Sequence, residues 1–278
     1  MLRRPLLFAV PAVVWMAVFF VAPFILLILF SFWRIEDQQL VREFGLQNYQ
    51  RILGQGPYAV SVLRSIQVAL VSTLLSCLVA YPVAYLLAFK VQSRLARLFL
   101  VLALLPFWTS YLVRSYSWLL VLGQSGVVNM ALLNTGLISE PLKIAYTKWA
   151  TIIGFVHFFS MLMLVTIFAA LVKIPKSYRL AAADLGASAV STFVRVILPL
   201  SAPGLLTGAF LCFVLAIGDF ATPQILGGGQ EMLLSQTAML FMQRNFDYTA
   251  TAAASVIMMG LILIVYLVIG RWLRLERI

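Results

Sequence analysis

Three ionisable residues, Arg114, His157 and Asp219, lie within long stretches of otherwise apolar sequence. Such groups are costly to place in an apolar medium, so they tend to be paired or to serve a function. The carboxylate of Asp219 could hold the ammonium group of a cationic solute. It could instead form a structural ion pair with Arg114, which is expected at a similar depth, or lie at an exposed helix end.

Small residues precede Asp219 at helical spacing. Gly204, Gly208, Cys212 and Ala216 recur every four residues, and in a helical projection Asp219 falls near the middle of the arc that they share. Small residues at this spacing let two helices approach closely. We therefore expect Asp219 to face protein or a cavity, not lipid.

Polar and aromatic residues accompany Arg114 in the sequence. Ser110 and Ser117 share its face in a helical projection, so the Arg114 side chain is also expected to point inward. The aromatic residues of this stretch have two interpretations. They enclose an alkylammonium chain through cation–π contacts, or they anchor the helix at the membrane interface. These residues are Trp108, Tyr111, Tyr116 and Trp118.

His157 is the only histidine of the chain. It shares a helical face with Gly154 and Met161. A histidine in such a position either packs in the protein interior or relays protons. The sequence leaves both interpretations open.

No set of residues typical of an enzyme or a metal site occurs in the sequence. A phosphate-binding G-x-x-x-x-G-K-[ST] loop is absent, and Gly227–Gly229 is followed by Gln230 instead of lysine. Neither a nucleophile with its base nor a pair of carboxylates can be assigned. Cys77 and Cys212 lie in apolar runs, so no structural disulfide is expected, and the spacings typical of zinc or haem sites are missing. We expect no catalysis, no metal and no cofactor bound by this chain.

The composition places these residues in a membrane. Of the 278 residues, 63% are apolar and 10% are charged, and the mean hydropathy is +1.02, whereas a soluble domain has about 25% charged residues. Too few charges remain to coat a globule of this size, so the chain must be dissolved in lipid. The net charge of +11 is then explained more simply by membrane orientation than by binding to nucleic acid.

Six stretches with little or no charge are long enough to cross a membrane, since about 30 Å of hydrocarbon takes roughly 20 helical residues. Their apolar residues are continuous rather than alternating, so we expect helices and not a barrel. The sequence predicts an all-α membrane protein with six transmembrane helices in one domain, residues 1–278. Short interfacial helices are expected at Gly45–Leu53 and Val127–Leu137, and a flexible turn at Gly227–Gly229. The six stretches are Pro5–Trp33, Ser65–Phe89, Leu98–Val113 with its weakly polar continuation Ser115–Ser139, Trp149–Val172, Val196–Gly218 and Tyr248–Gly270.

Six spans put both termini on one side of the membrane. That side carries 12 of the 20 basic residues in short segments, which is the pattern of a cytoplasmic side. Both termini are therefore expected in the cytoplasm. The basic residues of that side are Arg3, Arg4, Lys90, Arg94, Arg97, Lys173, Lys176, Arg179, Arg195, Arg271, Arg274 and Arg277.

One loop on this side, residues 173–203, has the pattern of a folded element. Pro175 marks a helix start, and Ala181–Ala183 favour helix. Gly186 interrupts this helix, and Pro199 is expected to end the amphipathic stretch that follows. Two short helices that meet at a glycine would form an elbow projecting into the cytoplasm. An amphipathic hairpin lying on the lipid headgroups is the alternative.

The same loop resembles the EAA loop of the permease subunits of type I ABC importers. It reads LAAADLG over residues 180–186 and continues to an Ile-Leu-Pro sequence at 197–199. The family's glutamate falls on Leu180, which is a departure from the motif. The residues that match the motif are Ala181, Ala182, Gly186, Ile197 and Pro199. Asp184 is an acidic residue within the same segment, and we expect it to take part in coupling as well.

The resemblance extends over nearly the whole chain. The segments GLQNY at 45–49, LPFWT at 105–109 with Arg114 and Tyr116, and AIGDFATPQILGG at 216–228 are similar to the spermidine/putrescine permease subunits. Permeases for opines, amino-acid derivatives and phosphonates share much of this sequence pattern.

The resemblance implies a MetI-like permease fold in the bacterial inner membrane and the import of a small cationic solute, most simply a polyamine. Its implied partners are a second homologous permease subunit, an ATPase homodimer that binds ATP and Mg²⁺, a periplasmic or extracellular substrate-binding protein, and lipid. The EAA loop would couple this chain to the ATPase. A permease for another small metabolite is one alternative, and a self-sufficient secondary transporter that uses Asp219, Arg114 and His157 is another.

Overall fold

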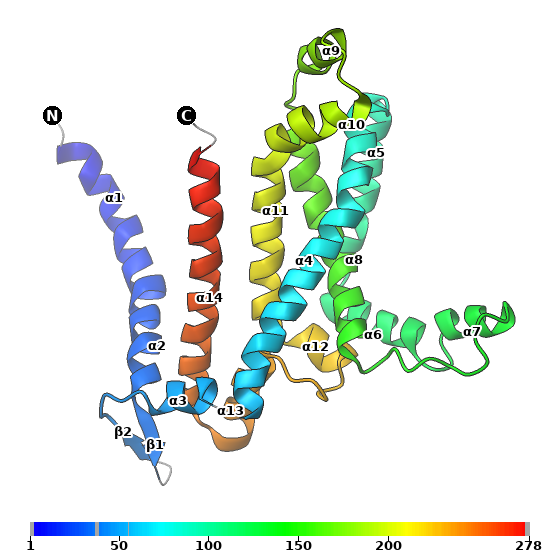
Figure 1. The fold of residues 1–278 in the computed structure, drawn as a ribbon. Coiled ribbons are helices and arrows are strands. Elements are labelled where there is room, and N and C mark those ends of the chain that lie inside the picture. Colours follow the sequence, from blue (N-terminus) through cyan, green and yellow to red (C-terminus); the bar gives the residue numbers. More distant parts are fainter. Residues whose placement is uncertain (1–2, 37–38, 55, 276–278) are drawn as a thin grey trace. The chain divides into compact units, whose positions relative to one another are not determined.

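A computed structural model describes residues 3–36, 39–54 and 56–275 and is almost entirely helical (Figure 1). Arg277, one of the basic residues assigned to the cytoplasmic side, lies outside these ranges. Two compact units are formed by residues 1–62 with 234–261 and by residues 63–233 with 262–278. The helices α4 (Pro57–Phe89) and α14 (Tyr248–Leu275) run from one unit into the other. The expectation of one domain over 1–278 stays a prediction.

The first unit begins with a long apolar helix. The helix α1 (Arg3–Met16) continues through a π-helical turn, η1 (Ala17–Val21), into α2 (Ala22–Phe32). A short antiparallel hairpin follows, in which β1 (Arg34–Glu36) pairs with β2 (Gln39–Val41). The unit is completed by the first turn of α4, by the first part of α14, and by α3 (Gln47–Leu53) and α13 (Leu234–Asn245).

An ion pair connects two segments of the first unit that are distant in the sequence. Arg51 on α3 binds Asp247 at 3.0 Å, and its guanidinium lies over the rings of Tyr58 and Phe241. Asp247 also accepts a hydrogen bond from the backbone N–H of Ala250 at 2.9 Å, so it caps the start of α14. One carboxylate therefore starts a membrane helix and holds it to α3.

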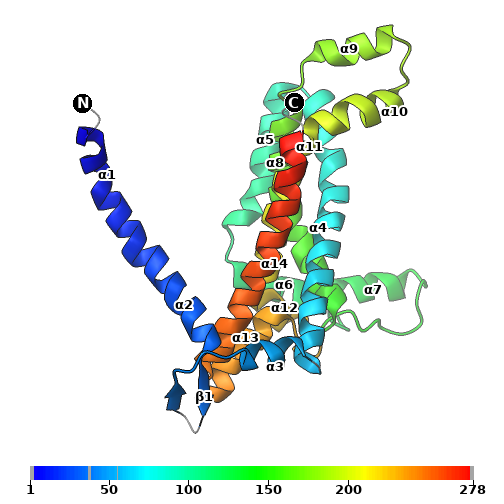
Figure 2. The same ribbon diagram turned by 60° about the vertical axis from the view of Figure 1, so that its left-hand side comes forward.

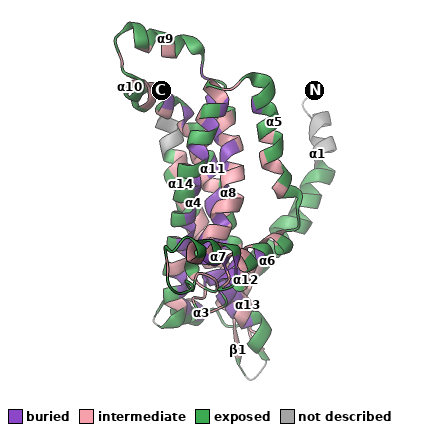
Figure 3. Cartoon of the chain, turned by 90° about the vertical axis from the view of Figure 1, so that its right-hand side faces the viewer, coloured by how far each residue is buried: buried purple, intermediate pink, exposed green. Residues whose placement is uncertain are grey.

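The second unit is built around α8 (Lys148–Leu171) and α11 (Leu198–Gly218), which pack along their length. Buried residues lie on these two helices and on α4, whereas α5 is largely exposed (Figure 3). At one end of α11 are α9 (Lys176–Asp184), α10 (Ala189–Thr192) and the π-helical η3 (Phe193–Ile197), and at its other end is α12 (Ala221–Leu226) (Figure 2). The remaining elements are α5 (Ser93–Leu104), the 3₁₀ turn η2 (Leu105–Trp108), α6 (Tyr111–Leu122) and α7 (Val127–Asn134).

Within the described residues, six helical stretches are long and apolar enough to cross a membrane, which confirms the predicted number. Helices are present in both segments predicted to be interfacial, as α3 and α7, and their place at the interface stays a prediction. The turn at Gly227–Gly229 has positive φ values at its last two residues. The six stretches are Val10–Phe32, Pro57–Phe89, Tyr111–Asn134, Lys148–Leu171, Ala189–Gly218 and Tyr248–Arg271.

Three differences from the sequence prediction have a clear local cause. The second stretch begins at Pro57 rather than Ser65, because a single charged residue, Arg64, is tolerated within the helix. The third is broken between α5 and α6, since Pro106 lacks an N–H and the chain is extended at residues 109 and 110.

The fifth stretch gives the third difference, because Pro199 does not end a helix as predicted. Pro199 lies in the first turn of α11, directly after the π-helical turn of η3. The N–H of Leu198 bonds to the carbonyl of Phe193, five residues back. This wider turn passes into α11, where proline is tolerated in the first turn.

Candidate functional site

The predicted small-residue face of α11 lies against α8. A Cβ at Gly204 would collide with the Cβ of Ala170 and would lie 2.6 Å from the backbone oxygen of Thr166. A Cβ at Gly208 would collide with Thr166 as well. Cys212 is fully buried on the same face. The glycines therefore allow the two backbones to approach closely, as the sequence predicted.

Asp219 marks the end of α11 and the start of α12. The helix stops at Gly218, and Asp219 has an extended backbone with φ −79° and ψ 122°. Its Oδ1 atom accepts hydrogen bonds from the N–H groups of Ala221 at 2.8 Å and Thr222 at 3.2 Å. Asp219 is thus the helix cap of α12, a role in which aspartate is strongly preferred. The sequence projection, which continued α11 through this residue, was wrong on that point.

The second carboxylate oxygen of Asp219 meets α6. The phenol hydroxyl of Tyr111 donates a hydrogen bond to Oδ2 of Asp219 and is also bonded to the hydroxyl of Thr222. The Thr222 side chain also bonds to Asp219, so the three side chains form one hydrogen-bonded cluster. Because Thr222 is only 3% exposed, these bonds join the first turn of α6 to the α11–α12 break inside the protein.

Arg114 lies on the other side of Tyr111. Its guanidinium carbon is 4.7 Å from the centre of the Phe158 ring and 5.7 Å from that of Tyr111. Both distances are typical of cation–π contacts. Among the described residues, Arg114 forms no ion pair, and its buried Nε and Nη1 atoms have no hydrogen-bond partner. Tyr111 therefore separates Arg114 from Asp219, and the direct ion pair that the sequence left open is not formed.

The space around these groups is small. Tyr111, Arg114, Phe158 and Thr222 line a void of about 10 Å³ together with residues of α8 and α12. This is about the volume that one water molecule needs. Gly154 allows the close approach of α12 to α8, because a Cβ there would lie 3.2 Å from the Cγ2 atom of Thr222. The site is therefore closed in this structure.

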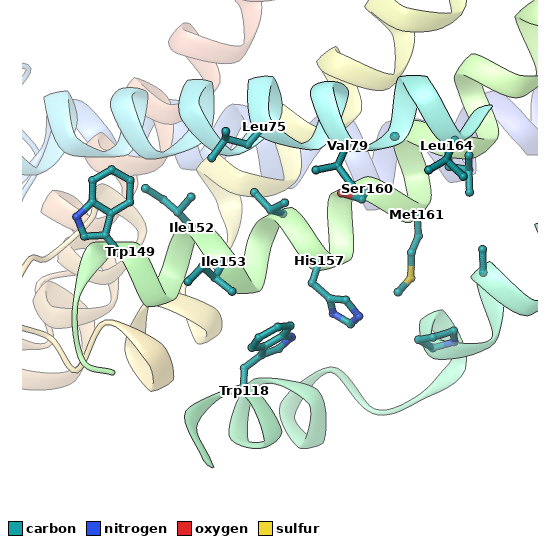
Figure 4. Close-up of a pocket in the computed structure, with 15 residues that line it drawn as sticks. Leu75, Val79, Trp118, Trp149, Ile152, Ile153, His157, Ser160, Met161 and Leu164 are labelled. Carbon is teal, nitrogen blue, oxygen red and sulfur yellow. The ribbon is translucent and has the colours of Figure 1, made fainter. Parts of the chain in front are cut away.

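His157 lies outside that void, in a separate apolar cavity (Figure 4). Its ring is 5.5 Å from that of Trp118 on α6, and Ser160 and Met161 line the same cavity of about 610 Å³. Within the described part of the chain, the Nδ1 atom of His157 and the hydroxyl of Ser160 are buried without a partner. The lining is almost entirely apolar, which does not suit a polyamine.

The structure separates the other residues predicted for the substrate path. Trp108 is 87% exposed and Tyr116 is 56% exposed, so they form no closed box with Tyr111 and Trp118. Ser110 is exposed at the start of α6, where its backbone oxygen accepts the N–H of Arg114. Of the predicted set, Tyr111 and Asp219 are in direct contact, and Arg114 joins them through the Tyr111 ring.

Two residues of the site were not predicted. Thr222 could have been found, since Asp219 followed by Pro223 has the spacing of a helix cap and an early proline. Phe158 gave no such signal, because a single phenylalanine in an apolar stretch is not distinctive in the sequence. Its contact with Arg114 depends on how α6 packs against α8.

The predicted elbow is present at the other end of α11. The helix α9 ends at Asp184. Two residues later Gly186 has φ +77°, and the N–H groups of Gly186 and Ala187 bond to the carbonyls of Ala183 and Ala182. This is the Schellman arrangement, which favours glycine at that position. Ser188 then caps α10 by accepting the N–H of Ser191 at 3.2 Å.

The elbow is attached to α4. Phe193 lies edge-on to the rings of Tyr81 and Tyr85, and Arg179 lies 4.5 Å from the Phe89 ring centre. Ile197 is 1% exposed, whereas Leu180 on α9 is 64% exposed. The other motif residues, Ala181, Ala182, Asp184 and Pro199, are exposed or half-buried.

Comparisons with known proteins assign the fold and the family. The structure is similar to a chain of the bacterial alginate ABC transporter in complex with an alginate pentasaccharide-bound periplasmic protein, with a TM-score of 0.75, 16% identity, and 97% of this chain and 94% of that chain covered. Residues 80–274 match the family described as binding-protein-dependent transport system inner membrane component.

Two curated relatives narrow this assignment. The chain is 35% identical over 256 residues to the spermidine/putrescine transport system permease protein PotB of Escherichia coli (strain K12), covering 91% of this chain and 92% of that protein. It is 36% identical over 257 residues to PotB of Salmonella typhimurium (strain SL1344), covering 91% and 88%. The chain belongs to the family of inner-membrane components of binding-protein-dependent transport systems. The resemblance to ABC importer permeases is confirmed, and the chain is a multi-pass inner-membrane protein.

Proposed function

We propose that this chain is the membrane-spanning subunit of an ATP-driven importer for a polyamine such as spermidine or putrescine. The observation that carries the proposal is the 35% identity to a spermidine/putrescine permease over 91% of the chain. This extent includes the segment from α6 to α12 that forms the Tyr111–Asp219 site. A polyamine is a flexible cation, and its recognition needs carboxylates and aromatic rings.

The chemistry of the site supports a cationic cargo. Asp219 supplies a carboxylate, and Tyr111 and Phe158 supply aromatic faces within the same cluster. An anion such as a phosphonate would be repelled by Asp219. In this proposal Asp219 and Tyr111 contact the cargo, while Arg114 controls access to them. Trp108 and Ser110 line the approach, and His157 packs in its apolar cavity.

The elbow is the proposed contact with the ATPase. The distribution of basic residues favours an orientation with both termini in the cytoplasm. In that orientation α9 and α10 also lie on the cytoplasmic side. The exposed surface of α9 and the Gly186 turn would dock on one subunit of an ATPase homodimer, which binds ATP and Mg²⁺. A second, homologous permease chain and a substrate-binding protein would complete the importer. The chain itself would have no catalytic role and bind no cofactor or metal.

Reconstitution tests the proposed function. The chain is purified with its partner permease and ATPase, placed in proteoliposomes and supplied with the binding protein and labelled spermidine. We expect uptake only when ATP and Mg²⁺ are present on the side of the ATPase. Uptake driven by an ion gradient without ATP would instead indicate a secondary transporter. Uptake of an opine or a phosphonate in place of spermidine would overturn the polyamine assignment.

A further inference from the structure

Arg114 is an unusual residue for a path that carries cations. A guanidinium is always charged at physiological pH, and its burial is costly unless an opposite charge compensates it. Here the compensation comes from two aromatic rings, at 4.7 Å and 5.7 Å, and no described acid pairs with it. The buried Nε and Nη1 atoms lack hydrogen-bond partners among the described residues.

The rings around Arg114 form a subsite for a cation. Phe158 is held in place by Phe107, which stacks on it at 5.0 Å, and by Tyr111, which lies edge-on at 6.0 Å. The hydroxyl of the same Tyr111 is bonded to the carboxylate of Asp219. Two aromatic faces beside a carboxylate are the groups that recognise an alkylammonium ion.

This subsite is already full. The void beside Arg114 and Thr222 measures about 10 Å³, which leaves no room for a second cationic group. An ammonium could reach Phe158 only if the guanidinium moved away. It could reach Oδ2 of Asp219 only if the Tyr111 hydroxyl released that oxygen.

We propose that the guanidinium of Arg114 occupies the subsite in which an ammonium group of the cargo binds during transport. The chain thus carries a tethered substitute for its own cargo. In the closed site Arg114 rests on Phe158 and Tyr111, and an arriving ammonium displaces it and takes its place over Phe158. This inference rests on the proposed import of a cation. It adds a binding subsite centred on Phe158 and identifies the Arg114 guanidinium as the group that competes for it.

The test is equilibrium binding to the purified importer complex without its binding protein, measured by calorimetry. Spermidine and n-butylammonium are the probes, and uncharged 1-butanol is the reference. Arg114→Gln removes the competing cation and should lower the Kd of both amines by about fivefold or more, the change expected for a cation–π contact of about 1 kcal/mol. Phe158→Leu added to Arg114→Gln should raise both Kd values by a similar factor relative to Arg114→Gln alone. In the wild-type background Phe158→Leu should change them little, because the guanidinium and the ammonium lose the same ring contact. Butanol binding should not respond to either change.

Phe210→Leu is the matched control. Phe210 lies on α11 and contacts the Tyr266 ring at 5.8 Å, so it is an aromatic residue outside the subsite, and its replacement should leave the Kd unchanged. If Arg114→Gln does not assemble, Arg114→Met keeps the apolar stem and replaces that variant, both alone and combined with Phe158→Leu.

Each outcome decides the proposal. Equal or weaker amine binding by the Arg114 variants overturns it, as does unchanged binding when Phe158→Leu is added to an Arg114 variant. If butylammonium binding follows the expected pattern but the wild-type complex does not import spermidine, the subsite stands and the polyamine assignment fails. If spermidine is imported but neither probe responds to the variants, the polyamine assignment stands and the subsite fails.

Discussion

Tyr111 and Asp219 are 108 residues apart in the sequence and are joined by a hydrogen bond from the phenol hydroxyl to the carboxylate. The same carboxylate caps α12 through its other oxygen. One acidic side chain thus ends one membrane helix, starts a short second one and holds both to α6. Any movement of α6 relative to α11 must break the Tyr111 bond or carry α12 with it.

Replacement of Tyr111 by phenylalanine tests this connection. The change removes the hydroxyl that bonds to both Thr222 and Asp219. A hydrogen bond to a charged group contributes about 1.5–3 kcal/mol, so the apparent melting temperature in detergent should fall. Tyr116→Phe is the control, because that side chain is 56% exposed. Equal melting temperatures for the two variants would contradict the proposed connection.

The turn at Gly186 offers a test of coupling. A non-glycine residue in a left-handed conformation costs about 1–2 kcal/mol, so Gly186→Ala should distort the end of α9. We expect a severalfold loss of ATP-driven uptake while the complex still hydrolyses ATP. The two rates are measured on the same proteoliposomes.

The control for this experiment is Gly136, another glycine with positive φ that follows a helix. Gly136 follows α7 with φ +69°, its N–H bonds to Leu133, and a Cβ would meet nothing within 4 Å, as is also true at Gly186. Gly136→Ala carries the same backbone cost outside the elbow and should retain coupled uptake. If both variants lose uptake equally, the loss reflects general strain and not the elbow.

Because α8 and α11 are in close contact, one added methyl group between them should lower the stability of the complex. Gly204→Ala places a Cβ against Ala170 and 2.6 Å from the Thr166 carbonyl, which belongs to rigid helical backbone. Overpacking of this kind costs about 1–3 kcal/mol, so the complex should unfold at a lower temperature. Gly260→Ala on α14, where a Cβ meets nothing within 4 Å, should be neutral or slightly stabilising. A stable Gly204→Ala variant would refute the close approach.

The number of spans could be predicted because the membrane restricts the chain so strongly. A polar backbone in lipid must form helices of a minimum length, and the apolar runs record that length. The breaks were harder to predict because proline acts differently according to its position. Pro106 lies in the 3₁₀ turn at which the chain leaves α5, whereas Pro199 lies in the first turn of α11 after a π-helical turn.

The site could be predicted only in part. Asp219 stood out as an acid beside a small-residue face, and that face does pack against α8. The projection extended α11 through Asp219, although the helix ends at Gly218 and the Asp219 carboxylate caps the next helix. The positions of Tyr111 and Phe158 relative to Asp219 and Arg114 depend on contacts between helices that are distant in sequence, and spacing along one helix holds no information on them.

The most direct test of the account is spermidine uptake by the reconstituted importer with Asp219→Asn. Asparagine is also a good helix cap, so α12 should keep its start and the complex should assemble normally. The variant loses the negative charge, and a hydrogen bond to a charged group is worth about 1.5–3 kcal/mol. We predict that ATP-driven uptake falls by about tenfold or more while assembly is unchanged. An assembled variant with the uptake rate and half-saturating spermidine concentration of the wild type would contradict a role of Asp219 in binding the cation.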